Sequence, residues 1–225
     1  MLYSIFYIIL GYLLGSIPFG YLITHFSTGK NILEIGWRKT SGSNVFKSVG
    51  KWQGLVTGIL DVGKGALAVF LVQSLGQTIQ VQALCGVAAV TGHNYSCFLK
   101  FAGGRGIGTL IGALLALSPG ILGYSITPLI LLALIWNASI GTIFFLITAI
   151  VLAANFGQLE TVGLLPLISL LPIFIKRLSP IKELSLEKKE LIRNRLIFDD
   201  DIPRFDLRIK RIIKRLTKIQ NSDKV

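Results

Sequence analysis

The chain has 225 residues, of which 52% are hydrophobic and only 15% are charged, and its mean hydropathy is +0.68. An average soluble domain carries about 25% charged residues, whereas no acidic or basic residue occurs here over 65–99 or 106–159. These stretches exclude a water-soluble globular fold. Because lipid forces the backbone to hydrogen-bond within itself, they indicate membrane-spanning helices.

Pro, Gly and charged residues mark the ends of the apolar segments. The first segment lacks the basic start of a cleaved signal peptide, so it is interpreted as a membrane helix. The fourth is too short to cross without tilt or local thinning, and a re-entrant segment is its alternative. The sequence predicts an all-α, polytopic membrane protein of about seven transmembrane helices, at 3–25, 53–74, 79–96, 105–117, 119–136, 139–156 and 159–175.

Basic residues predict the orientation, because Lys and Arg in short loops favour the cytoplasmic face. They accumulate in loop 26–52, in segment 97–105 and in the tail. Seven crossings place all three on one side and the neutral turn 75–78 on the other. We therefore expect an external N-terminus and a cytoplasmic C-terminus.

The tail differs in composition from the rest of the chain, which predicts a membrane domain over 1–176 and a basic cytoplasmic tail over 177–225. Within 205–219, apolar residues recur every three or four positions between Lys and Arg, which is typical of an amphipathic helix. Anionic membrane lipid is the expected partner of this helix, a protein is the alternative, and no nucleic acid is expected. The acidic run 199–201 is interpreted as a solvated linker and a helix N-terminal turn.

Loop 36–47 is the first polar cluster. It supplies hydroxyls, an amide and cations in a setting that suits an anion. Ordinary hydrophilic loops share this composition, so a solvated loop is the alternative. Its candidate phosphate-binding residues are Ser43, Asn44 and Lys47.

Asp61 and Lys64 form the second cluster, inside an apolar helix. Ionisable groups in a membrane span are expensive and usually paired or functional, and a spacing of three puts these two on one helical face. Both are candidate substrate-binding residues, with a structural ion pair as the alternative. Segment 58–65 nearly matches a nucleotide-binding P-loop, but it lacks the Ser or Thr after the lysine and a preceding strand, which excludes that function.

Segment 92–109 is the most specific cluster. Its paired glycines, followed by Arg105 just before a predicted helix, expose backbone N–H groups where the helix dipole is positive. Arg105 adds a planar guanidinium whose paired N–H donors match the oxygens of a phosphate. His93 is the candidate catalytic proton carrier, and a structural histidine is the alternative. The candidate phosphate-binding residues here are Lys100, Gly103, Gly104, Arg105, Gly106 and Thr109.

Several motifs, in order and at matching spacing over roughly 1–175, resemble the bacterial acyl-phosphate-dependent glycerol-3-phosphate acyltransferase family. The resemblance implies a seven-helix bundle in the bacterial inner (plasma) membrane with its functional loops on the cytoplasmic side. It also implies acyl transfer from acyl phosphate to the 1-hydroxyl of glycerol 3-phosphate, which forms lysophosphatidate for phospholipid biosynthesis without cofactor or metal. The matching stretches are 12–23, 48–51, Asp61 to Gly65, Gly92-His93, and Gly103 to Gly106 with Thr109.

The chain is a divergent member by this resemblance. Trp37 and Lys39 stand where the family has Ser and Asn, while Lys47 and Arg105 replace an Arg and a Lys. The third family motif, a His-x-x-Asn-Ile expected near 177–189, is missing. The alternative function is therefore a catalytically impaired member that binds phospholipid precursors or a partner enzyme. A transporter of phosphorylated solutes would be favoured by inverted repeats, and none is visible.

Overall fold

The computed structural model describes residues 2–180 and 189–203, which form helices and contain no β-strand. Two short 3₁₀ helices, η1 (Ile32–Glu34) and η2 (Cys97–Leu99), lie in loops. The all-helical prediction is confirmed. The α-helices are α1 (Leu2–Ser16), α2 (Phe19–Thr28), α3 (Gly42–Ser48), α4 (Lys51–Ser74), α5 (Ile79–Asn94), α6 (Ile107–Leu117), α7 (Pro119–Ile135), α8 (Ala138–Asn155), α9 (Leu164–Arg177) and α10 (Lys189–Phe198).

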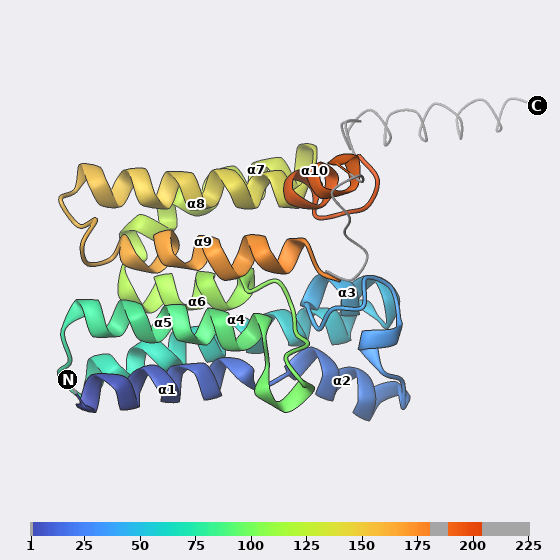
Figure 1. The fold of residues 1–225 in the computed structure, drawn as a ribbon, viewed down its shortest axis with the longest axis horizontal. Helices are drawn as coiled ribbons and strands as arrows, with labels where there is room; N and C mark the ends of the chain where they lie inside the picture. Colours follow the sequence, from blue (N-terminus) through green and yellow to red (C-terminus); the bar gives the residue numbers. More distant parts are fainter. Residues whose placement is uncertain (1, 181–188, 204–225) are drawn as a thin grey trace, which may run out of the picture.

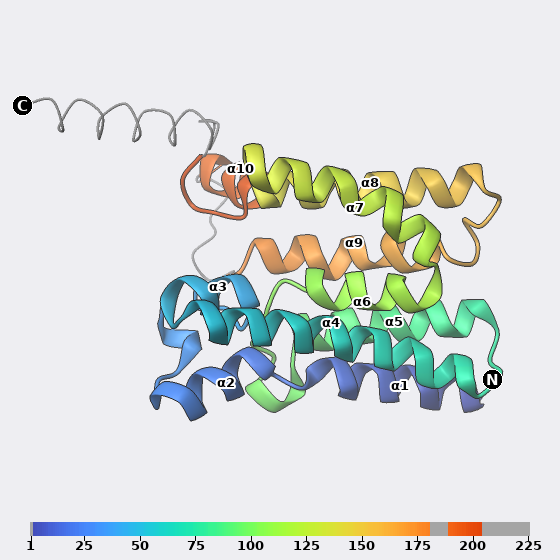
Figure 2. The same ribbon diagram turned by 180° about the vertical axis from the view of Figure 1, so that it is seen from behind.

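The long helices lie side by side in one bundle (Figures 1 and 2). α1 and α2 follow one another along one edge, α4, α5 and α6 come next, and α9 separates them from the α7–α8 pair. α3, α10 and the loop before α6 gather at one end of the bundle, whereas α1 begins at the other end, beside the turn between α4 and α5. The loops with many basic residues thus share one end, as the charge pattern predicts.

The helices present apolar surface outwards, as expected for a multi-pass membrane protein. Three stretches are long and apolar enough to cross a membrane, Ser4–Thr28, Lys51–Ser74 and Ala138–Asn155, and α6 and α7 are shorter apolar helices. Large side chains such as Phe6 on α1 and Phe70 on α4 are more than half exposed. In lipid such exposure carries no hydrophobic penalty.

The structure differs from the predicted elements in several places. The first predicted helix is two helices, because Pro18 has no backbone N–H to continue the helical hydrogen bonds. The last membrane helix begins at Leu164, since the residues before it form turns. Two helices, α3 and α10, were not predicted at all. The predicted amphipathic helix at 205–219 lies outside the described residues.

The close approach of α4 and α6 fixes the position of Asp61 relative to the start of α6. A Cβ at Gly65 on α4 would overlap the Thr109 backbone of α6, and a Cβ at Gly112 on α6 would overlap the Val62 backbone of α4. Small residues that let two backbones approach closely are a common basis of helix association in membranes. The contact brings the first turn of α6 against Asp61, whose Cβ lies 3.4 Å from the position of a Cβ at Gly108.

This packing predicts a difference between two glycines of α4. Gly65→Ala should destabilise the fold by roughly 1–3 kcal/mol because the added methyl has no room. Gly63→Ala, two residues away, meets no atom within 4 Å and should be neutral or slightly stabilising, since Ala favours helix. Unfolding of the purified variants in mixed micelles measures both, and equal effects would contradict the close α4–α6 contact.

Candidate active site

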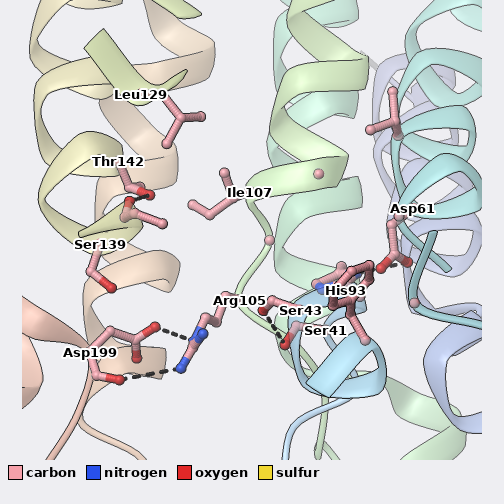
Figure 3. A pocket seen from close by; sticks show the side chains of 18 of the residues that line it. Ser41, Ser43, Asp61, His93, Arg105, Ile107, Leu129, Ser139, Thr142 and Asp199 are labelled. Carbon is pink, nitrogen blue, oxygen red and sulfur yellow. Dashed lines mark hydrogen bonds and ion pairs between the residues drawn. The ribbon is translucent and has the colours of Figure 1, made fainter. Parts of the chain in front are cut away.

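A cavity of about 770 Å³ lies between the α3–α4–α6 side of the bundle and the α7–α8 side (Figure 3). Its polar side chains come from α3 and the loop before α6 on one side and from α8, α9 and Asp199 on the other, and Ile107 and Leu129 form apolar parts of the wall. Of the predicted site residues, the ones that line it are Ser43, Lys47, Asp61, His93, Arg105 and Gly106.

The Asp61 carboxylate is buried in α4 and has two partners. Its Oδ1 lies 3.0 Å from Lys64 Nζ on the next turn and 3.3 Å from His93 Nδ1 on α5. Lys64 Nζ also donates to the carbonyl oxygen of Ile17 at 2.7 Å, at the break between α1 and α2. The cluster therefore connects α4 to α5 and to the α1–α2 break. Lys64 does not line the cavity, and its ammonium contacts Asp61 and the Ile17 carbonyl oxygen.

His93 is oriented by the same carboxylate. A carboxylate beside Nδ1 favours the proton on that nitrogen and leaves Nε2 as the proton acceptor. On the other side the ring packs on Gly104, where a Cβ would overlap Nε2. The Gly104 N–H donates to the His93 carbonyl oxygen at 3.0 Å. This glycine thus serves the packing of the loop on His93, and its N–H is already occupied.

Gly106 begins α6 in the left-handed conformation, with φ 79°, and it lines the cavity together with Ile107 and Gly108. The first N–H groups of a helix have no partner within the helix, and the dipole there favours an anion. The part of the predicted phosphate cradle that reaches the cavity is therefore Arg105, Gly106 and the start of α6. Gly103 instead packs against the backbone of His93 and Asn94.

Arg105 projects from this loop toward the cavity (Figure 3). Its guanidinium carbon lies 4.5 Å from the ring centroid of Trp37, and Lys47 Nζ lies 4.1 Å from the same ring. Such cation–π contacts favour Arg and Trp in particular. Trp37, which the family resemblance aligns with a serine, thus contacts both Arg105 and Lys47.

Asn44 is buried and organises loop 35–39. Its Nδ2 donates to the carbonyl oxygens of Lys39 at 2.9 Å and Ile35 at 3.2 Å, and its Oδ1 accepts from the Trp37 N–H at 2.9 Å. These bonds shape the loop that presents Trp37 and Lys39. Asn44 was predicted to bind phosphate, but the structure uses its amide within the protein.

A smaller polar chamber of about 120 Å³ adjoins the cavity and shares Arg105, Arg177 and Asp199 with it. Lys39 Nζ lies 3.2 Å from Asp199 Oδ1, and Arg105 Nε contacts the other carboxylate oxygen. Burial lowers the pKa of Lys39, and Asp199 acts in the opposite direction. A hydrogen bond from Arg195 Nε at 2.5 Å lowers the pKa of Asp201.

Lys100 and Thr109 also do not line the cavity, in addition to Asn44, Lys64, Gly103 and Gly104. Lys100 is exposed at the end of η2, and Thr109 is buried at the contact of α6 with α4. The described residues contain no group of three His, Cys, Asp or Glu side chains that could hold a metal ion.

Asp199 was not predicted to belong to a site, and the interpretation of the acidic run as solvated is wrong for this residue. Its side chain is only 3% exposed and it follows α10 directly. The available signal was charge complementarity in a chain of net charge +12, since Asp199 and Asp201 of the acidic run pair with the largely buried cations Lys39, Arg105 and Arg195. Arg177, which lines both cavities, was likewise not singled out.

A sequence profile described as Glycerol-3-phosphate acyltransferase matches residues 5–185. The chain belongs to this family. It is 43% identical over 118 residues to a glycerol-3-phosphate acyltransferase of Synechococcus sp. (strain CC9902), covering 52% of this chain and 59% of the relative. It is 41% identical over 128 residues to glycerol-3-phosphate acyltransferase 2 of Dehalococcoides mccartyi, covering 56% and 61%. These matches span about three fifths of the relatives' length.

The fold is shared with a solved structure of PlsY, an integral membrane glycerol 3-phosphate acyltransferase, in its glycerol 3-phosphate form. The two chains are 28% identical, with a TM-score of 0.70 over 80% of this chain and 90% of that one. The lysophosphatidic acid form of PlsY gives a TM-score of 0.66 at 27% identity, with the same coverage. The family and the membrane fold predicted from the sequence are therefore confirmed.

The buried charge cluster yields a prediction about stability. Asp61→Asn should destabilise the fold by about 3–5 kcal/mol, because it leaves the Lys64 ammonium buried without its carboxylate. Lys64→Met added to that variant should restore most of the loss, since the unpaired charge is then gone. Chemical unfolding of the single and double variants in micelles tests this, and a double variant whose losses simply add would contradict a coupled pair.

Proposed function

We propose that the chain transfers an acyl group from acyl phosphate to the 1-hydroxyl of glycerol 3-phosphate and so forms lysophosphatidate for phospholipid biosynthesis. The observation that supports this most is the cavity itself. It combines Arg105 and His93 with the apolar side chains of Ile59, Ile107 and Leu129. In a member of this family, such a cavity suits a charged headgroup joined to an acyl chain.

The two substrates make different demands on the cavity. Acyl phosphate needs an apolar wall for its chain, and both substrates need cations and N–H groups for phosphate. The Arg105 guanidinium supplies paired N–H donors, and Lys47 supplies a second positive charge. The start of α6 supplies backbone N–H groups. Ser43 lines the same region, 3.3 Å from the Ser41 hydroxyl.

The proposed reaction needs no nucleophile from the protein, because acyl phosphate is already activated. The 1-hydroxyl oxygen bonds to the acyl carbon, the bond between that carbon and the phosphate oxygen breaks, and inorganic phosphate leaves. The hydroxyl proton passes to His93 Nε2 or to a substrate phosphate. Asp61 then acts as a positioning residue for His93. Holding the two substrates together lowers the activation barrier by several kcal/mol, roughly 7–11 at most.

A second candidate function is that of a catalytically impaired member that binds phospholipid precursors or a partner enzyme. The missing third motif and the presence of Asp199 on Arg105 favour it. The distinguishing experiment is a turnover assay of the purified, folded protein with acyl phosphates of several chain lengths and glycerol 3-phosphate. Lysophosphatidate formation supports the enzyme, whereas binding of glycerol 3-phosphate without product supports the second function.

If the enzyme function holds, Arg105→Ala should raise the KM for a phosphorylated substrate about tenfold to a hundredfold, because a charge-assisted contact is worth roughly 1.5–3 kcal/mol. Arg105→Lys restores the residue that the family resemblance places here and should keep most of the activity. Steady-state kinetics separate KM from kcat. A fall in kcat alone, with KM unchanged, would mean that Arg105 does not contribute to ground-state binding.

We also propose that the chain lies in a bacterial plasma membrane with its N-terminus outside and its C-terminus cytoplasmic, as a membrane domain over 1–176 and a tail over 177–225 that binds anionic lipid. The support is the gathering of the basic loops at one end of the bundle (Figure 1).

Reporter fusions test this orientation. A reporter that is active only in the cytoplasm should work after residue 225, and one active only outside should work before residue 1. Two termini on the same side would contradict an odd number of crossings.

A further inference from the structure

The Asp199 carboxylate pairs with Lys39 and Arg105, which both line the polar chamber, and Arg105 also lines the cavity. One oxygen lies 3.2 Å from Lys39 Nζ and the other contacts Arg105 Nε, while the Asp199 carbonyl oxygen accepts from Arg105 Nη2 at 3.3 Å. Figure 3 shows the carboxylate across from His93, pointing at the guanidinium. Because Asp199 lines both the cavity and the polar chamber, an external anion that binds Arg105 on this side has to take its place.

The position of Asp199 does not depend on this ion pair alone. Arg177 donates to the Leu196 carbonyl of α10 at 2.6 Å and to the Ser139 carbonyl of α8 at 2.9 Å. Arg195 donates to the Leu178 and Pro180 carbonyls at 3.2 and 3.1 Å. These bonds hold α10 on α8 and α9, so loss of the carboxylate does not by itself undock the helix.

A phosphate group matches the same cations better than a carboxylate does. A phosphomonoester carries about −1.5 to −2 charge at neutral pH and three acceptor oxygens, whereas Asp199 offers one charge and two oxygens. Lys39 and Arg105 are largely buried, with side-chain exposures of 10% and 17%. A compensating anion stabilises buried cations, and either the Asp199 carboxylate or a bound phosphate can serve as that anion.

We propose that Asp199 is an internal competitor for the phosphate of a phosphomonoester, and that α10 together with Asp199 regulates access to Lys39 and Arg105. The competitor is displaced when the phosphate binds. The inference rests on the proposed function only in taking glycerol 3-phosphate as the phosphomonoester. Asp199 itself sits at φ 51°, a conformation that Gly adopts freely, which provides a variant without the carboxylate and without new backbone strain.

The test is the affinity of the full-length protein in micelles for glycerol 3-phosphate and for inorganic phosphate, measured by calorimetry without acyl donor. Asp199→Asn should lower the Kd for both at least fivefold, and Asp199→Gly should change it in the same direction. Glu190→Gln removes one negative charge from the exposed side of α10 and should leave both constants unchanged. Thermal stability should also rise more steeply with phosphate in the Asp199 variants than in the unchanged protein.

An unchanged or weaker affinity in both Asp199 variants would overturn the proposal and would assign Asp199 the role of orienting the cations. Equal tightening by Glu190→Gln would also overturn it, because net charge would then explain the gain. Turnover assays separate this inference from the proposed function. If the protein shows no acyl transfer but the Asp199 variants bind phosphate more tightly, the competitor role of Asp199 is supported and the proposed function is not. If the protein is active but the dissociation constants are unchanged in the Asp199 variants, only the competitor role is overturned.

Discussion

The carboxylate of Asp61 lies within the helix bundle and is met by Lys64 at 3.0 Å and by His93 at 3.3 Å. A buried carboxylate needs such partners, since burying an unpaired charge costs several kcal/mol. Through His93 the effect extends to Gly104, which packs on the imidazole, and so to the loop that directs Arg105. One interaction within the bundle thereby sets the relative position of His93 and Arg105.

The divergent residues of the chain form a second, connected set around Arg105. Trp37 lies beside its guanidinium, and Lys47 contacts the same ring. Lys39 and Arg105 share one carboxylate that comes from the tail. Substitutions that look independent in the sequence are thus in contact, which is the situation in which their effects do not add.

The sequence predicted most of the fold, because long uncharged stretches indicate membrane-spanning helices and the asymmetry of basic residues indicates which loops share a side. It placed Asp61, His93 and Arg105 at one site, since residues at helix ends on one side of a bundle meet. It did not predict α3, because the seven residues of this helix include only two apolar side chains, Val45 and Phe46, which are too few for a periodic signal. It did not predict Asp199, because its pairing with Arg105 spans 94 positions of sequence. Asn44 and Lys64 were expected to bind substrate, but no local pattern separates an internal hydrogen bond from a ligand contact.

An experimental structure of the protein with glycerol 3-phosphate bound would test most directly whether the Asp61 cluster organises the site. We expect His93 Nδ1 to remain on Asp61 while the phosphate lies against Arg105 within the cavity. A phosphate bound away from Arg105, or a His93 ring turned away from Asp61 in the complex, would contradict the geometry on which the proposed function depends.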